Sequence, residues 1–256
     1  DETNVTSNNK GDKLLSVSNN PYDFVGNLHR QGVNFAKDNI SSFNPKYVAD
    51  WKDSIDFQVA QYFDIILDSL HPLSNWTIDT TLYLLDQQTP IFGADSLYAE
   101  ISKLYNGNFI NSEQLYYITK ILDIMLDSSY NNNFDVTYAI NAIIDLENDI
   151  ITNVSEPDRV CLLCMSAVAK DSYDYWYHEA HEEYTSWMDL YEQVSFKKSL
   201  KRSFILEKEK AAPGWAHHAA ADAVGAVTGG FKWGTKAALG GALVFGVSDS
   251  PTKVVG

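Results

Sequence analysis

The sequence predicts an all-α fold: an irregular array or bundle of about seven helices, followed by a glycine-rich helical segment. Apolar residues recur at helical spacing along most of residues 20–196, and no segment there alternates convincingly as a half-buried strand does. Asn, Ser and Pro mark the predicted helix ends. Because 45% of the 256 residues are hydrophobic, the chain can bury a sizeable core.

The first helix is predicted to start at Asn20-Pro21, because Asn caps helices and Pro suits a first helical turn. Apolar residues at helical spacing then predict a helix over 47–70 and a shorter one over 77–87. A proline follows each of these two segments, and proline cannot continue a helix.

Four more helices are predicted between these segments and the tail. A short amphipathic one covers 95–105, and Asn111 opens the next with a capping-box pattern. Asp135 can cap a third. A long helix is predicted over about 155–192, where a Ser-x-x-Asp pattern with an early proline is a strong start signal.

Charge is unevenly distributed along the chain, which has an acidic part and a basic part. Residues 1–196 carry 10 basic and 30 acidic side chains, whereas residues 197–256 carry 9 basic and 4 acidic ones, which together account for the net charge of -15. An acidic body does not favour nucleic acid, which is bound through basic surface. A basic tail can dock on the acidic body or on an anionic partner such as a membrane surface.

Three domains follow from these boundaries: a flexible polar leader over 1–19, an acidic helical domain over 20–196, and a basic, glycine- and alanine-rich tail over 197–256. The leader is typical of the spacer that follows the cleavage site of an exported protein or the lipidated cysteine of a lipoprotein. No uninterrupted apolar run reaches the 18 residues that an ordinary membrane-spanning helix needs.

The densest group of metal-ligating residues is His178, His181 and Glu182. At helical spacing these side chains share one face and can present ligands to a divalent metal. A solvated polar face explains the same residues. The Cys161-x-x-Cys164 pair lies inside an apolar run, which favours two buried thiols over a redox or zinc site. No catalytic residue is predicted, since no nucleophile elbow, P-loop or dinucleotide motif occurs.

The tail collects 8 of the 14 glycines of the chain between residues 214 and 246. Four of them, Gly225, Gly229, Gly230 and Gly234, continue a ladder of small residues spaced four apart. Such a ladder gives a helix a flat face for close pairing with another helix, or for association in a membrane. The charges of Asp222, Lys232 and Lys236 interrupt the apolar stretch and disfavour a standard membrane span.

Residues 214–246 resemble the glycine-zipper peptides of class II bacteriocins, which are small, cationic and membrane-active. The resemblance implies a membrane-inserting or helix-pairing role for the four glycines. The body, from NPYDFVGNLHRQGVNFAKDNI onward, is similar to uncharacterised exported or lipoprotein-type helical proteins of bacteria. That similarity implies the cell envelope as the location, whether exported or lipid-anchored, and assigns no site residues.

Together these features predict a non-enzymatic helical protein of the cell envelope, which contacts a protein or a membrane surface through its tail. Two alternatives stay open: a metal-dependent enzyme centred on His178, and a bacteriocin-like toxin or immunity component.

Overall fold

The computed structural model describes residues 17–40, 57–58, 60–62, 65, 93–127, 136–156, 158–181 and 214–233. The regular elements of these residues are all helices, which confirms the all-α prediction. The helices are α1 (Phe24–Ile40), α4 (Gly93–Asn106), α5 (Ser112–Leu126), α7 (Val136–Asn153), α8 (Asp158–His181) and α11 (Gly214–Trp233).

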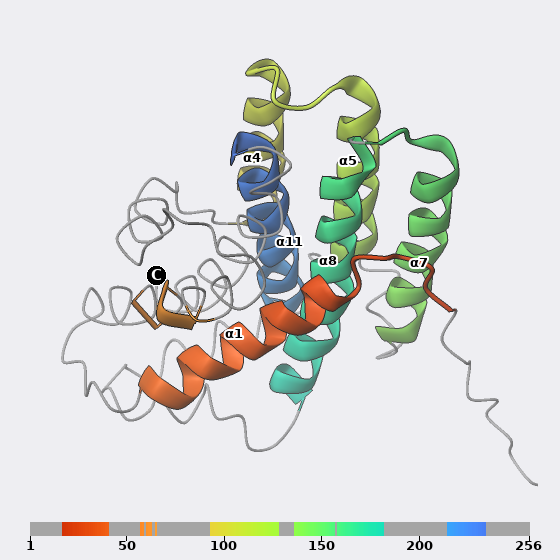
Figure 1. The fold of residues 1–256 in the computed structure, drawn as a ribbon. Coiled ribbons are helices and arrows are strands. Elements are labelled where there is room, and N and C mark those ends of the chain that lie inside the picture. Colours follow the sequence, from red (N-terminus) through yellow and green to blue (C-terminus); the bar gives the residue numbers. More distant parts are fainter. Residues whose placement is uncertain are drawn as a thin grey trace, which may run out of the picture.

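Helix α8 lies at the centre of the array. It contacts α1, α5, α7 and α11, and α11 also contacts α4 and α5. In Figure 1, α1 crosses obliquely over α8 while the other helices run roughly side by side. The oblique crossing brings residues of α1, α8 and α11 to one place in the interior.

The described parts of the acidic domain and of the tail share one hydrophobic core. The α8 residues from Cys161 to Ala169 are all buried, as are those of α11 from Ala219 to Gly230. A helix that is apolar on every side must be enclosed by other elements. Helix α11 is therefore an internal helix of the body, although the residues flanking it are more basic.

The capping residue predicted for α5 is confirmed. The Asn111 side chain accepts a hydrogen bond from the backbone N–H of Gln114, and the Gln114 side chain accepts one from the backbone N–H of Asn111. Helices α4, α7 and α8 begin within three residues of the predicted starts. The predicted helices over 47–70 and 77–87 lie outside the described residues, apart from six helical positions between 57 and 65.

The last residues of the predicted leader lie against the body. The Ser18 hydroxyl donates to Glu147 at 3.0 Å, and the Asn19 amide donates to Asn148 at 3.3 Å. Asn20 is 6% exposed and its amide nitrogen donates to Glu147 at 2.7 Å and to the Leu163 carbonyl at 2.8 Å. These bonds fix the chain where it enters α1; residues 1–16 lie outside the described part.

Candidate functional site

A buried polar cluster lies where α1, α8 and α11 meet. His29 of α1 is 1% exposed, and Ser172 of α8 and Asp222 of α11 are fully buried. The Ser172 hydroxyl lies 3.2 Å from His29 Nδ1, and Asp222 Oδ2 lies 3.7 Å from His29 Nε2. Trp176 Nε1 donates a hydrogen bond to the same Asp222 oxygen at 2.9 Å. We call these four residues the His29 cluster.

Gly26 brings α1 close enough to α8 for His29 to enter this cluster. A Cβ atom at Gly26 would lie 2.5 Å from the Ala167 carbonyl oxygen, a distance that real side chains do not adopt. His29 follows three residues later, on the same face of the helix. The absence of a side chain at Gly26 is therefore what allows the imidazole to reach Ser172.

Charged groups at the edge of the His29 cluster are paired with one another. Asp171 Oδ2 lies 3.9 Å from His29 Nδ1, while Asp171 Oδ1 accepts from Arg30 Nε at 2.8 Å. Arg30 also donates to Asp174 at 2.8 Å. Burial lowers the pKa of Arg30, but the two carboxylates outweigh burial and raise its pKa overall. The guanidinium therefore stays charged and holds α1 to α8.

The order Ser172, His29, Asp222 is that of a nucleophilic triad, in which an aspartate orients a histidine that activates a serine. Two features distinguish this cluster from a working triad. The His29–Asp222 separation of 3.7 Å exceeds hydrogen-bond length. All three side chains are also closed to solvent, so a substrate cannot reach the Ser172 hydroxyl. In this conformation the arrangement joins three helices.

A second buried polar group joins α7, α8 and the start of α1. Glu147 is fully buried and accepts hydrogen bonds at 2.7 Å from Asn20, Ser166 and Lys170. Lys170 also pairs with Asp23 at 2.7 Å. A buried carboxylate with several donors and a counter-charge is satisfied. Glu147 is therefore a structural residue.

The predicted metal ligands are described only in part. His178 lies near the end of α8 with its side chain 56% exposed, and its Nε2 atom is 3.5 Å from Asp174 Oδ1. His181 is the last residue of α8, and Glu182 lies outside the described residues. Across the part of the chain that the structure describes, no three His, Cys, Asp or Glu side chains converge as a metal site requires.

Three of the four predicted glycines lie in α11. Gly225, Gly229 and Gly230 are buried, whereas Gly234 lies outside the described residues. None of the helices described is both long and apolar enough to cross a membrane.

The two cysteines of α8 are free and buried, as the sequence analysis favoured. Burial raises the pKa of the Cys161 thiol to about 12, with a smaller contribution from the charge of Asp158. Burial raises the pKa of Cys164 as well. Both thiols are neutral near pH 7 and are therefore poor nucleophiles and poor metal ligands.

Sequence reasoning did not single out His29 as a member of this cluster. The available signal was Asp222, the one carboxylate in a helix made mostly of small and apolar residues. A charge in such a helix needs a buried partner, but its partners are 193 and 46 residues away in the sequence.

No family model matches the chain, and neither a curated protein nor a solved structure matches it. The interpretation of both polar groups therefore rests on their geometry.

Proposed function

We propose that the protein is a non-enzymatic helical protein of the bacterial cell envelope that acts by contacting other molecules. The observation that supports this proposal most strongly is the enclosure of the His29 cluster. Among the described residues it is the constellation most similar to catalytic machinery, and its serine is fully buried. Its hydrogen bonds connect helices, as expected of a cluster that stabilises the fold.

Helix α11 has a structural role in this proposal. Its small residues allow close packing inside the body, and Asp222 fastens it to Trp176. A membrane-inserting role would require α11 to leave these contacts and to expose its apolar surface. In this proposal the glycine face of α11 packs against other helices of the body. The exposed surface of the protein is the part that contacts other molecules.

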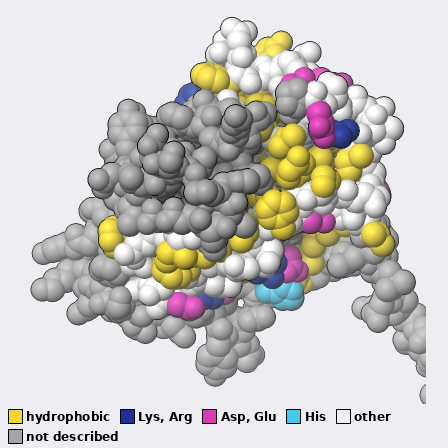
Figure 2. Space-filling view, in the orientation of Figure 1, with side chains coloured by type: hydrophobic (Ala, Val, Ile, Leu, Met, Phe, Trp, Pro, Cys, Tyr) yellow, Lys and Arg dark blue, Asp and Glu magenta, His cyan; other side chains and the backbone are white. Residues whose placement is uncertain are grey.

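That surface carries several large apolar side chains. On the face in Figure 2, hydrophobic side chains are exposed between polar and charged ones. The described large apolar residues with high exposure include Phe24, Tyr105, Phe109, Tyr116 and Tyr138. Exposed aromatic rings are typical contact residues because they bury much area at little entropic cost. The envelope location rests on the polar leader and on the resemblance to exported proteins.

A fluorophosphonate reagent, which phosphonylates activated serines, tests the non-enzymatic proposal. The wild-type protein and a Ser172→Ala variant are incubated with the reagent near pH 7 and digested for mass spectrometry. We expect no modification of Ser172, because the folded protein encloses it. Modification that is abolished by Ser172→Ala and by prior unfolding would contradict the proposal and indicate a serine hydrolase.

The alternatives have separate tests. Metal analysis of purified protein, with His178→Ala as the comparison, tests the metal-dependent enzyme. One bound metal ion per chain in the wild type, and none in the variant, would favour that alternative.

Flotation with anionic vesicles, with and without residues 211–256, tests the bacteriocin-like membrane role. Flotation that depends on those residues would favour insertion over helix pairing.

A further inference from the structure

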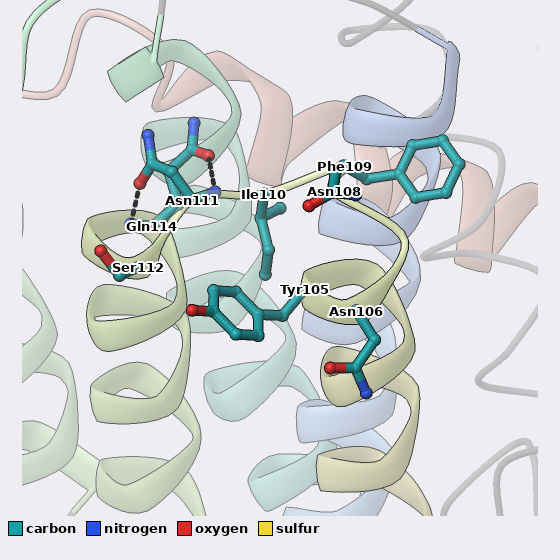
Figure 3. A pocket seen from close by; sticks show the side chains of 8 residues that line it. All are labelled: Tyr105, Asn106, Asn108, Phe109, Ile110, Asn111, Ser112 and Gln114. Atoms are coloured by element: carbon teal, nitrogen blue, oxygen red, sulfur yellow. Dashed lines mark hydrogen bonds between the residues drawn. The ribbon is translucent and has the colours of Figure 1, made fainter.

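A hollow of about 610 Å³ opens at the turn between α4 and α5, away from the His29 cluster. Figure 3 shows Tyr105 extending from α4 toward α5 below Ile110, and Phe109 projecting from the turn on the other side. The remaining lining residues come from the end of α4, from the turn and from the first turn of α5: Asn106, Asn108, Asn111, Ser112 and Gln114. Every lining residue is uncharged, although the chain carries a net charge of -15.

The turn has a defined conformation. Asn108 adopts a φ of 58°, in the left-handed region that few residues besides glycine and asparagine adopt readily. At the preceding Gly107, a Cβ atom would lie 2.8 Å from two carbons of the Phe109 ring, so glycine is what allows the ring to lie there. This conformation closes the C-terminus of α4: the Phe109 N–H donates to the Leu104 carbonyl at 2.9 Å, and the Asn108 N–H donates to the Tyr105 carbonyl at 3.0 Å.

The α5 side of the hollow is anchored to α8. The Asn111 amide nitrogen donates to the Asp158 carboxylate at 3.4 Å, and the Gln114 amide nitrogen donates to the Asp158 carbonyl at 3.3 Å. Together with the reciprocal capping bonds between Asn111 and Gln114, these contacts fix both amides. A ligand therefore meets a preorganised surface, which lowers the entropic cost of binding.

The chemistry of the lining combines rings with available polar groups. Tyr105 is 41% exposed and Phe109 is 47% exposed. Within the described residues, the side chains of Asn106, Asn108 and Ser112 make no hydrogen bond. Single exposed rings are common on protein surfaces. What distinguishes this place is the combination of two exposed rings, one on each side of the turn, with three available hydrogen-bonding side chains around one hollow.

We propose that this hollow binds a neutral oligosaccharide lying across the turn. The C–H faces of sugar rings are apolar and stack on Tyr105 and Phe109, while the hydroxyls pair with the amides of Asn106 and Asn108. An apolar peptide would leave these amides without partners, at the cost of their desolvation. An anionic ligand would find no cationic side chain in the lining. The inference rests on the proposed function and names the ligand class for it.

Isothermal titration with four soluble hexasaccharides tests the inference: those of β-1,4-glucose, α-1,4-glucose, β-1,4-mannose and β-1,4-N-acetylglucosamine. We expect at least one to bind the wild-type protein, and Phe109→Ala and Asn108→Gly each to weaken its binding about tenfold or more. Glycine suits the left-handed backbone at position 108, so the second variant removes the amide and preserves the turn. Tyr138→Ala, at a 45% exposed ring on α7, is the matched control and should bind as the wild type does.

Two results would overturn the inference: no binding of any of the four at millimolar concentration, or binding that Phe109→Ala and Asn108→Gly leave unchanged. Circular dichroism confirms that each variant is folded. Failure here differs from failure of the proposed function, because labelling of Ser172 by the fluorophosphonate, which tests that function, does not depend on carbohydrate binding.

Discussion

The His29 cluster and the α4–α5 turn use polar and aromatic side chains in opposite ways. In the cluster, Trp176 is 1% exposed and its indole N–H is bonded to a buried carboxylate. In the turn, Phe109 is about half exposed and the neighbouring Asn108 side chain makes no hydrogen bond within the described residues. Polar groups that are mutually satisfied stabilise a fold, whereas available ones beside exposed rings can bind a ligand. The difference separates residues that stabilise the fold from residues that can bind a ligand.

The largest expected effect comes from Asp222→Ala. It removes the acceptor of the Trp176 Nε1 hydrogen bond and the carboxylate beside His29, so we expect a loss of about 3 kcal/mol in the free energy of unfolding. Asp222→Asn should cost less, because the amide oxygen can still accept from Trp176. Urea denaturation measures both variants.

Thr228→Val is the matched control on α11. Thr228 is 6% exposed and its hydroxyl has no hydrogen-bond partner among the described residues, so valine should be neutral or slightly stabilising. If Asp222→Ala were as stable as Thr228→Val, the carboxylate would have no role in fastening α11.

Gly26→Ala should have the next largest effect. The added methyl group would meet the Ala167 carbonyl oxygen and push α1 away from α8, at a cost of about 1–3 kcal/mol. Asn27→Ala, at the exposed neighbouring position, should change stability by less than about 0.5 kcal/mol. Equal stability of the two variants in thermal or urea unfolding would mean that α1 does not approach α8 this closely.

Alkaline pH should weaken the α8 core. The pKa of Cys161 rises from an ordinary value of 9.0 to about 12 on folding, so the folded state favours the neutral thiol. The corresponding stability is fully present below pH 9 and is lost as the pH rises from about 9 to about 12. At about pH 9.5 we expect this thiol to account for a loss of about 0.8 kcal/mol relative to pH 7.

Urea unfolding of the wild type and of Cys161→Ala at the two pH values isolates this contribution. The variant should lose less stability than the wild type between them. A parallel loss in both proteins would show that the Cys161 thiol already titrates normally in the folded state.

The smallest expected effect is at the α4–α5 turn. Phe109→Ala should change the free energy of unfolding by less than about 0.5 kcal/mol, because its ring is half exposed. Ile110→Ala, one residue later and 4% exposed, should cost about 2–5 kcal/mol. Similar costs for the two would place Phe109 in the core and remove it from a binding surface.

Local patterns predicted much of the fold. Helical spacing identified α4, α5, α7 and α8, and the capping box at Asn111 located the start of α5. These signals lie within a few residues of one another, so a single sequence contains them. The glycine ladder likewise predicted a helix with a face suited to close pairing in the segment that forms α11.

The His29 cluster could not be predicted in the same way. Its members come from three helices, and the contact between His29 and Asp222 spans 193 residues. Spacing within a helix carries no information about which distant helix packs against it. The hollow at the α4–α5 turn was missed for another reason: Asn108 and Phe109 have no unusual spacing, and their exposure follows only from the folded turn.

Hydrogen–deuterium exchange of the full chain, with and without anionic vesicles, tests the central claim that α11 is an internal helix of the body. We predict that amides from Ala219 to Gly230 exchange as slowly as those of α8, and that vesicles leave their protection unchanged. Rapid exchange of α11 beside a protected α8, or protection that changes only when vesicles are added, would contradict the claim.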